Sequence, residues 1–195
     1  VASNLAVVLS RSAGGADEAA ELFEDTAQRR RRVLGAEHPE TLRTLEMQAV
    51  LLRRQGRFDD AENLCRQVLE IRRRTLGDEH PDTVDSVMAL AVVLAKQGRA
   101  GEAVRMLRSA LATAERTVGP DHPTTFNILG NLGNTLMAQG KIEEAEEVFR
   151  ELLSASERLF GPDHPRTQQA RNALAAVFHE TGRPDEADAL VSSAQ

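Results

Sequence analysis

The stretch PDHPTTFNILGNLGNTLMAQGKIEEAEEVFRELLSASERLFG, residues 120–161, decides the fold because it is one copy of a repeated unit. An acidic residue followed by His-Pro opens each copy at a constant interval of 42 residues, at His38, His80, His122 and His164. The same interval separates Gly-centred turns, at Gly56, Gly98, Gly140 and Gly182. Repeats of this size stack on their neighbours along one dimension, so the sequence predicts an extended binding surface rather than a catalytic pocket.

Within residues 120–161 the apolar residues follow a helical period. Leu129, Leu132 and Leu136 recur at spacings of three and four, and the pattern resumes after Gly140. This period predicts two amphipathic helices joined by a turn in which Gly140 adopts a left-handed conformation.

Each first helix is expected to begin at the proline of the His-Pro pair, whose fixed φ suits the first helical position. His122 or Asp121 would cap that helix in the quoted unit. The other predicted helix pairs are 39–54 with 58–75, 81–96 with 100–117, and 165–180 with 184–194. The first unit is incomplete: its opening helix starts at Val1, Asn4-Leu5-Ala6 matches Asn131-Leu132-Gly133, and the turn Ala13-Gly14-Gly15 carries one extra residue.

The composition argues against several classes of protein. A net charge of −6 and the absence of tryptophan and tyrosine disfavour nucleic acid as a partner. We expect no membrane partner, because no apolar run approaches the ~20 residues that span a bilayer. A single cysteine, Cys65, allows no internal disulfide, and its match to Phe149 predicts a core residue. Together these features predict a cytoplasmic protein.

The motifs resemble the tetratricopeptide signature. The quoted unit carries Leu132-Gly133-x2-Leu136 followed by Ala145-x3-Phe149, and the neighbouring units carry looser copies. The 42-residue length, with its acidic His-Pro and its Gly-Arg or Gly-Lys turn, resembles the kinesin-light-chain type. The resemblance implies an all-α fold, a right-handed α-solenoid of stacked antiparallel helix pairs with about 4.5 units. We expect one solenoid domain over 1–195, with units of roughly 1–35, 36–77, 78–119, 120–161 and 162–195.

The resemblance further implies that the first helix of each unit lines a concave groove. Positions not needed for packing on the partner helix would then face a ligand. The predicted groove residues are Arg43, Arg53, Arg54, Asp85, Met88, Val92, Lys96, Asn127, Asn131, Asn134, Met137, Asn172 and His179.

This predicted lining is uneven. The second unit offers arginines, whereas the third and fourth offer Met88, Val92 and Met137. Arginine pairs with carboxylates and methionine adapts to varied side chains, so we expect a protein or peptide ligand with an acidic segment and an apolar anchor. The alternative is a solvated face on which Glu46 and Asp85 balance the arginines.

Asn131 matches an asparagine that peptide-binding arrays of this family carry, and the resemblance implies that its amide holds a ligand backbone. The equivalent positions are Met47, Ala89 and Ala173, so most of that asparagine ladder is missing. The basic residues of a carboxylate clamp for chaperone C-termini are also missing.

The repeated histidines are interpreted as helix caps that also bond across the turn between units, because residues from different units cannot converge on one metal ion. We expect no metal site, no cofactor and no catalytic residues, since no phosphate loop or nucleophile motif is present. The basic runs Arg29 to Arg32 and Arg72 to Arg74 are interpreted as cations that complement helix C-termini rather than as a nucleic-acid site.

The ends of the sequence suggest a second interpretation. The last helix is expected to expose Ala187, Leu190 and Val191 without a polar cap, which solenoids normally need. The chain would then be a piece of a longer protein, for example the sensor arm of a larger signalling protein, or a structural module that self-associates as a homo-oligomer through its terminal repeats.

Overall fold

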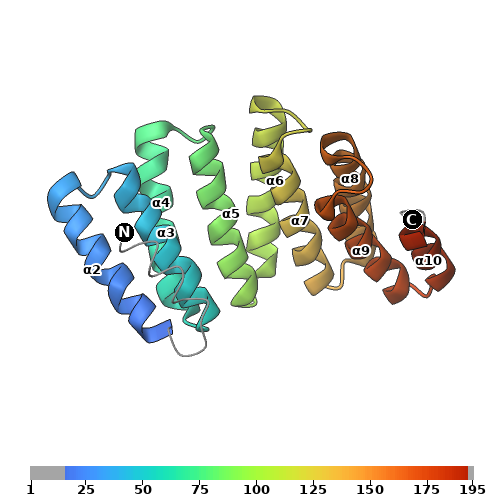
Figure 1. The fold of residues 1–195 in the computed structure, drawn as a ribbon, viewed down its shortest axis with the longest axis horizontal. Helices are drawn as coiled ribbons and strands as arrows, with labels where there is room; N and C mark the ends of the chain where they lie inside the picture. Colours follow the sequence, from blue (N-terminus) through green and yellow to red (C-terminus); the bar gives the residue numbers. More distant parts are fainter. Residues whose placement is uncertain (1–15, 193–195) are drawn as a thin grey trace. The chain divides into compact units, whose positions relative to one another are not determined.

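The computed structural model describes residues 16–192, and these residues form α-helices joined by short turns (Figure 1). In chain order the helices are α2 (Ala16–Leu34), α3 (Pro39–Arg54), α4 (Phe58–Leu76), α5 (Pro81–Lys96), α6 (Ala100–Thr117), α7 (Pro123–Ala138), α8 (Ile142–Phe160), α9 (Pro165–Glu180) and α10 (Pro184–Ser192). The described part of the chain contains no strand, so the predicted all-α class is confirmed. The predicted helix from Val1, including Asn4-Leu5-Ala6 and the turn Ala13-Gly14-Gly15, lies outside the described residues.

The chain divides into two compact units that are each larger than one repeat, Val1–Gln97 and Gly98–Gln195. From here on these two are called the first and the second unit, and the 42-residue copies are called repeats. In the first unit α3 packs on α2 and α4, and α4 also packs on α5. In the second unit each helix from α6 to α10 likewise packs on the next. Packing between consecutive helices is the arrangement expected of stacked helix pairs. The boundary falls in the turn before α6, and a single domain over 1–195 stays a prediction.

The start of every first helix is fixed by the histidine before its proline. The Nδ1 atom of His38 accepts a hydrogen bond from the backbone N–H of Glu40 at 3.2 Å. His80, His122 and His164 cap α5, α7 and α9 in the same way, at 3.1 to 3.2 Å. The predicted capping role is confirmed, and in the quoted repeat the cap is His122 rather than Asp121.

A side-chain bond across the turn between repeats comes from a threonine that stands two residues after the proline. The Thr125 hydroxyl donates to the carbonyl of Gly119 at 2.7 Å, and Thr167 donates to Gly161 at 2.7 Å. Both threonines are fully buried. This bond ties the start of α7 and of α9 to the end of the helix before it. The backbone N–H groups of His122 and His164 donate to the same two carbonyls at 3.4 Å and 3.5 Å, so the histidines also bond across the turn, as predicted.

In the core between α7 and α8 a very small residue lies against a large one. Gly133 on α7 lies against the Phe149 ring on α8, where an added Cβ would come within 2.5 Å of a ring carbon. The equivalent pair in the first unit is Ala49 with Cys65. Cys65 is buried, as predicted, and burial raises the pKa of its thiol to about 11. The thiol therefore stays protonated at neutral pH.

The prediction for the last helix is partly wrong. Ala187 on α10 is 1% exposed, because it occupies the same inward position as the buried Ala145 on α8. Leu190 is half-buried, and Val191 is exposed as predicted. The apolar surface on this helix is thus smaller than the sequence indicated.

Candidate functional site

The predicted groove residues all lie on the first helices, and none of them is buried. In the first unit, α3 carries Arg43, Arg53 and Arg54, and α5 carries Asp85, Met88, Val92 and Lys96. In the second unit, α7 carries Asn127, Asn131, Asn134 and Met137, and α9 carries Asn172 and His179. We call these residues the first-helix face.

The arginines of the first-helix face lie at two separate places on α3. Arg43 is near the start of the helix, where it pairs with Glu40 at 3.9 Å. Arg53 and Arg54 belong to the last turn. Ten residues of helix correspond to about 15 Å along the axis, so a single carboxylate cannot contact all three arginines.

Glu46, which the sequence alternative assigned to balance these arginines, is held by Arg72 instead. The two side chains pair bidentately, Nη1 to Oε1 at 2.5 Å and Nη2 to Oε2 at 2.9 Å. Arg72 is 7% exposed and also donates to the Ser86 hydroxyl at 2.7 Å. Burial raises the pKa of Glu46, while the neighbouring guanidinium opposes that shift. Glu46 is therefore part of the packing between α3, α4 and α5.

Arginines of both basic runs form ion pairs with carboxylates of the same chain. Arg72 is a buried partner of Glu46 rather than a solvent-facing cation at a helix end, which corrects the interpretation of that residue. Arg73 pairs with Asp78 at 2.8 Å, and Arg30 pairs with Glu40 at 3.0 Å. Cations that are already paired have less capacity to neutralise phosphates.

The Asn131 side chain forms a hydrogen bond within its own helix. Its Nδ2 atom donates to the Asn127 carbonyl at 2.9 Å. His179 is exposed in the last turn of α9. Among residues 16–192 no group of three or more His, Cys, Asp or Glu side chains is arranged to hold a metal ion. None of the helices in the described part has both the length and the apolar character to cross a membrane.

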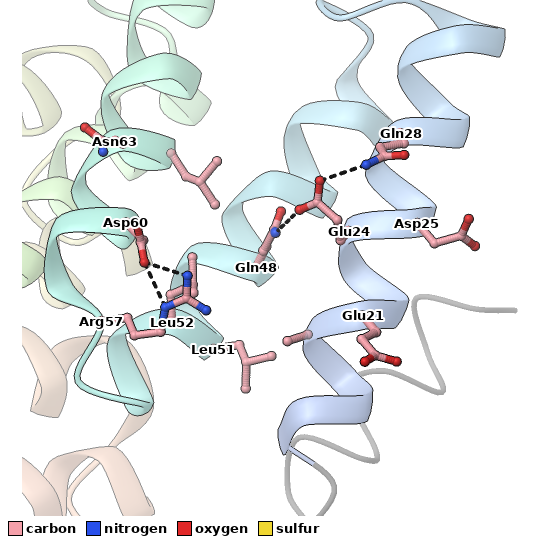
Figure 2. A pocket seen from close by; sticks show the side chains of 12 residues that line it. Glu21, Glu24, Asp25, Gln28, Gln48, Leu51, Leu52, Arg57, Asp60 and Asn63 are labelled. Atoms are coloured by element: carbon pink, nitrogen blue, oxygen red, sulfur yellow. Dashed lines mark hydrogen bonds and ion pairs between the residues drawn. The ribbon is translucent and has the colours of Figure 1, made fainter.

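The structure also contains a groove that the sequence interpretation missed. It has a volume of about 620 Å³ and lies between α2, α3 and α4 in the first unit (Figure 2). Its apolar lining comes from Ala20, Leu51, Leu52 and Leu64. Its acidic lining comes from Glu21, Glu24 and Asp25 on α2 and Asp60 on α4. We call it the α2–α4 groove, and it includes no residue of the first-helix face.

A second groove occupies the equivalent place in the second unit. It has a volume of about 450 Å³ and lies between α8, α9 and α10. Phe178 lines it, and the guanidinium groups of Arg150 and Arg183 lie 5.3 Å and 4.4 Å from the centre of the Phe178 ring. Arg150 thus stands where the first groove has Glu24, whereas Glu186 keeps the carboxylate of Asp60.

Comparison with known proteins identifies the family. The tetratricopeptide repeat pattern matches residues 1–74, 46–116, 84–153 and 124–194. The chain belongs to the tetratricopeptide repeat family. A search of curated proteins finds no match. This tetratricopeptide repeat chain is therefore a member of a family of protein-interaction scaffolds.

Solved tetratricopeptide-like structures agree with this assignment. A putative kinesin light chain from Podosopora anserina, with nearly identical repeats, is 26% identical with a TM-score of 0.81, and the match covers 99% of this chain and 91% of that chain. BtubC (BKLC) from P. vanneervenii is 20% identical with a TM-score of 0.78, over 94% of this chain and 74% of that chain. A Rap protein in complex with competence and sporulation factor is 19% identical with a TM-score of 0.75, over 90% of this chain and 47% of that chain. The resemblance to the kinesin-light-chain type is confirmed.

Proposed function

We propose that this tetratricopeptide repeat chain is a non-catalytic scaffold that binds a protein or peptide partner on its first-helix face. The observation that carries the proposal is that every predicted contact residue on α3, α5, α7 and α9 is exposed or half-exposed, while the opposite sides of these helices are buried. One solved protein of this fold is in complex with competence and sporulation factor.

The proposed partner combines an acidic segment with an apolar anchor. Arg43 and Arg54 are exposed on α3, and the carboxylate of Glu46 is committed to Arg72. Met88 on α5 is half-buried and offers an adaptable apolar contact. The net charge of −6 disfavours nucleic acid. In this proposal the chain acts in the cytoplasm, as the sensor arm of a larger signalling protein.

The test compares two variants with the same change in net charge. The first replaces Arg43, Arg53 and Arg54 with Gln. The control replaces Arg29, Arg73 and Arg74, which are exposed and lie off the first-helix face. The probe is a fluorescent synthetic peptide of Glu, Asp and Leu, titrated at low and high salt. We expect at least ~10-fold weaker, salt-dependent binding for the first variant and unchanged helicity for both. Equal weakening in both variants contradicts the proposal.

The second candidate function is self-association through the last helix. Val191 on α10 is 43% exposed, and the neighbouring Leu190 lines the second groove. Analytical ultracentrifugation over a range of concentrations distinguishes the two functions. A concentration-dependent dimer that Val191→Asp abolishes supports self-association, and a persistent monomer contradicts it.

A further inference from the structure

The α2–α4 groove carries excess negative charge over an apolar floor. Arg57 is the one cationic residue that lines it among the described residues, and it is already paired with Asp60 at 2.6 Å. Figure 2 shows Glu24 and Asp60 projecting from different helices on either side of the groove. The walls therefore have a carboxylate on both sides.

The repeat pattern shows what normally stands at these two positions. Residues that follow Glu24 at intervals of 42 are all arginine, at Arg66, Arg108 and Arg150. Residues that follow Asp60 at the same interval are all glutamate, at Glu102, Glu144 and Glu186. Glu24 is thus an acid at the position where the three later repeats have an arginine.

The second unit shows how the cation is used. On α8, the Oε1 atom of Glu144 lies 2.9 Å from the Nζ atom of Lys141. Its other oxygen, Oε2, pairs with Arg108 from α6. Each carboxylate oxygen of Glu144 thus has its own cation, one from the residue that precedes α8 and one from the preceding second helix.

Among the described residues, Asp60 has a counterpart of the Lys141 contact but no counterpart of the Arg108 contact. Arg57, the equivalent of Lys141, approaches a single oxygen, with Nε and Nη2 at 2.8 Å and 2.6 Å from Oδ2. The Oδ1 atom corresponds to the oxygen of Glu144 that Arg108 occupies. The position of that second guanidinium is taken by Glu24, which would repel rather than bind Asp60.

Glu24 is held as an ionised acceptor by neutral groups. Gln28 donates to its Oε1 at 3.0 Å and Gln48 donates to its Oε2 at 2.8 Å. These hydrogen bonds lower the pKa of Glu24 against a small opposing effect of burial, and Arg31 contributes in the same direction. The carboxylate is therefore oriented and charged at pH 7.

We propose that the α2–α4 groove binds an arginine-bearing segment of a partner protein, whose guanidinium lies between Glu24 and Asp60 as Arg108 lies against Glu144. The fork of the guanidinium suits two carboxylates, and apolar side chains beside the arginine pack on Leu51 and Leu64. A groove of about 620 Å³ has the size of an ordinary ligand site. This partner has the opposite charge from the one proposed for the first-helix face.

The test uses Glu24→Arg, which copies the other repeats. The new arginine should pair with Asp60, so the groove closes while the fold gains an ion pair. The matched control is Glu18→Arg, an exposed position on the same helix that does not line the groove. The probe is a synthetic peptide with one arginine flanked by leucines, compared with the same peptide carrying uncharged citrulline. We expect the wild type and Glu18→Arg to bind the arginine peptide, and Glu24→Arg to bind it at least ~10-fold more weakly with an equal or higher melting temperature.

Each other outcome overturns the proposal. Unchanged binding by Glu24→Arg rules out the groove, and equal losses in both variants show that only net charge matters. Equal binding of the arginine and citrulline peptides by the wild type, or no binding of either, rejects the guanidinium site even if Glu24→Arg fails to fold. Asp60→Asn provides a second variant, for which we expect weaker binding. The triple arginine variant of the first-helix face should retain this binding, which separates the two proposals.

Discussion

The two units solve the same packing problem with different chemistry. In the first unit, an arginine from each second helix enters the junction with the next first helix: Arg30 donates to the Thr44 hydroxyl at 2.5 Å, and Arg72 donates to the Ser86 hydroxyl at 2.7 Å. In the second unit the equivalent residues are Ala114 with Ile128 and Ser156 with Ala170, all of them buried.

At these positions the junction accepts either polar or apolar side chains, provided that the residues on both helices change together. A guanidinium needs a hydroxyl, a carbonyl or a carboxylate beside it, because an unpaired buried charge is costly. Ala114 leaves space that the larger Ile128 fills. The residue type on the first helix at each junction therefore has to match the charge and the size of the residue on the second helix.

The largest expected effect comes from breaking the polar junction. Arg72→Ala should lower the free energy of unfolding by about 3–5 kcal/mol, because it leaves Glu46 partly buried without its cation. Changing Glu46→Met and Ser86→Ile in the same chain copies Met88 and Ile128 and should recover most of that loss. Urea unfolding followed by circular dichroism measures both. A loss below ~1 kcal/mol for Arg72→Ala would show that the arginine is dispensable.

The next effect concerns the tight contact in the second unit. Gly133→Ala should cost about 1–3 kcal/mol, because the new Cβ overlaps the Phe149 ring. Adding Phe149→Leu gives this repeat the residue types that the sequence carries at the equivalent positions 91 and 107, and should restore part of the stability. Thermal unfolding of the single and double variants checks the coupling. If the two changes are simply additive, the two residues do not compensate each other.

The histidine caps should have equal effects in the two units. His80→Ala at α5 and His122→Ala at α7 are each expected to cost about 1 kcal/mol, because the first turn loses its side-chain acceptor. Asn at either position should restore part of the loss, since its side chain also caps helices. Hydrogen exchange in the first turn of α5 and α7 measures the local effect. A cost in only one unit would mean that its cap has an additional role.

The smallest effect is the pH dependence that Glu146 gives to the second unit. Burial acts against the ionised form of Glu146, but hydrogen bonds from Arg150 and Arg183 outweigh it and lower its pKa. The folded state thus binds a proton less readily than the unfolded state, so this carboxylate stabilises the fold above the unfolded pKa of ~4.3 and the contribution is lost as pH falls through the folded value. Glu146→Gln should cost up to about 1 kcal/mol at pH 7 and less at pH 3. An equal cost at both pH values would contradict the ion-pair role.

Much of the fold could be predicted because its signals are local. The period of leucines, the proline at each helix start and the glycine at each turn act within a few residues, so the bounds of α3, α5 and α9 agree with the prediction. The burial of Cys65 followed from its match to Phe149. The place of Arg72 could not be predicted, because its partners Glu46 and Ser86 come from two other helices.

The two candidate sites also differ in how far the sequence could predict them. Which side of a first helix is exposed follows from its period, so the exposure of the first-helix face could be predicted, while its contact with a ligand stays a prediction. The α2–α4 groove was missed because its walls come from three helices, although one sequence signal was available: Glu24 breaks a series of arginines.

The repeat length, the starts of the first helices and the family follow from the sequence, since they depend on backbone preferences and on the side-chain period along one helix. Only the tertiary structure decided which charges meet across helices, and therefore that Glu46 is neutralised internally while Glu24 and Asp60 line the same groove. Charges pair according to distance in space, and the distance between side chains on different helices is set by packing.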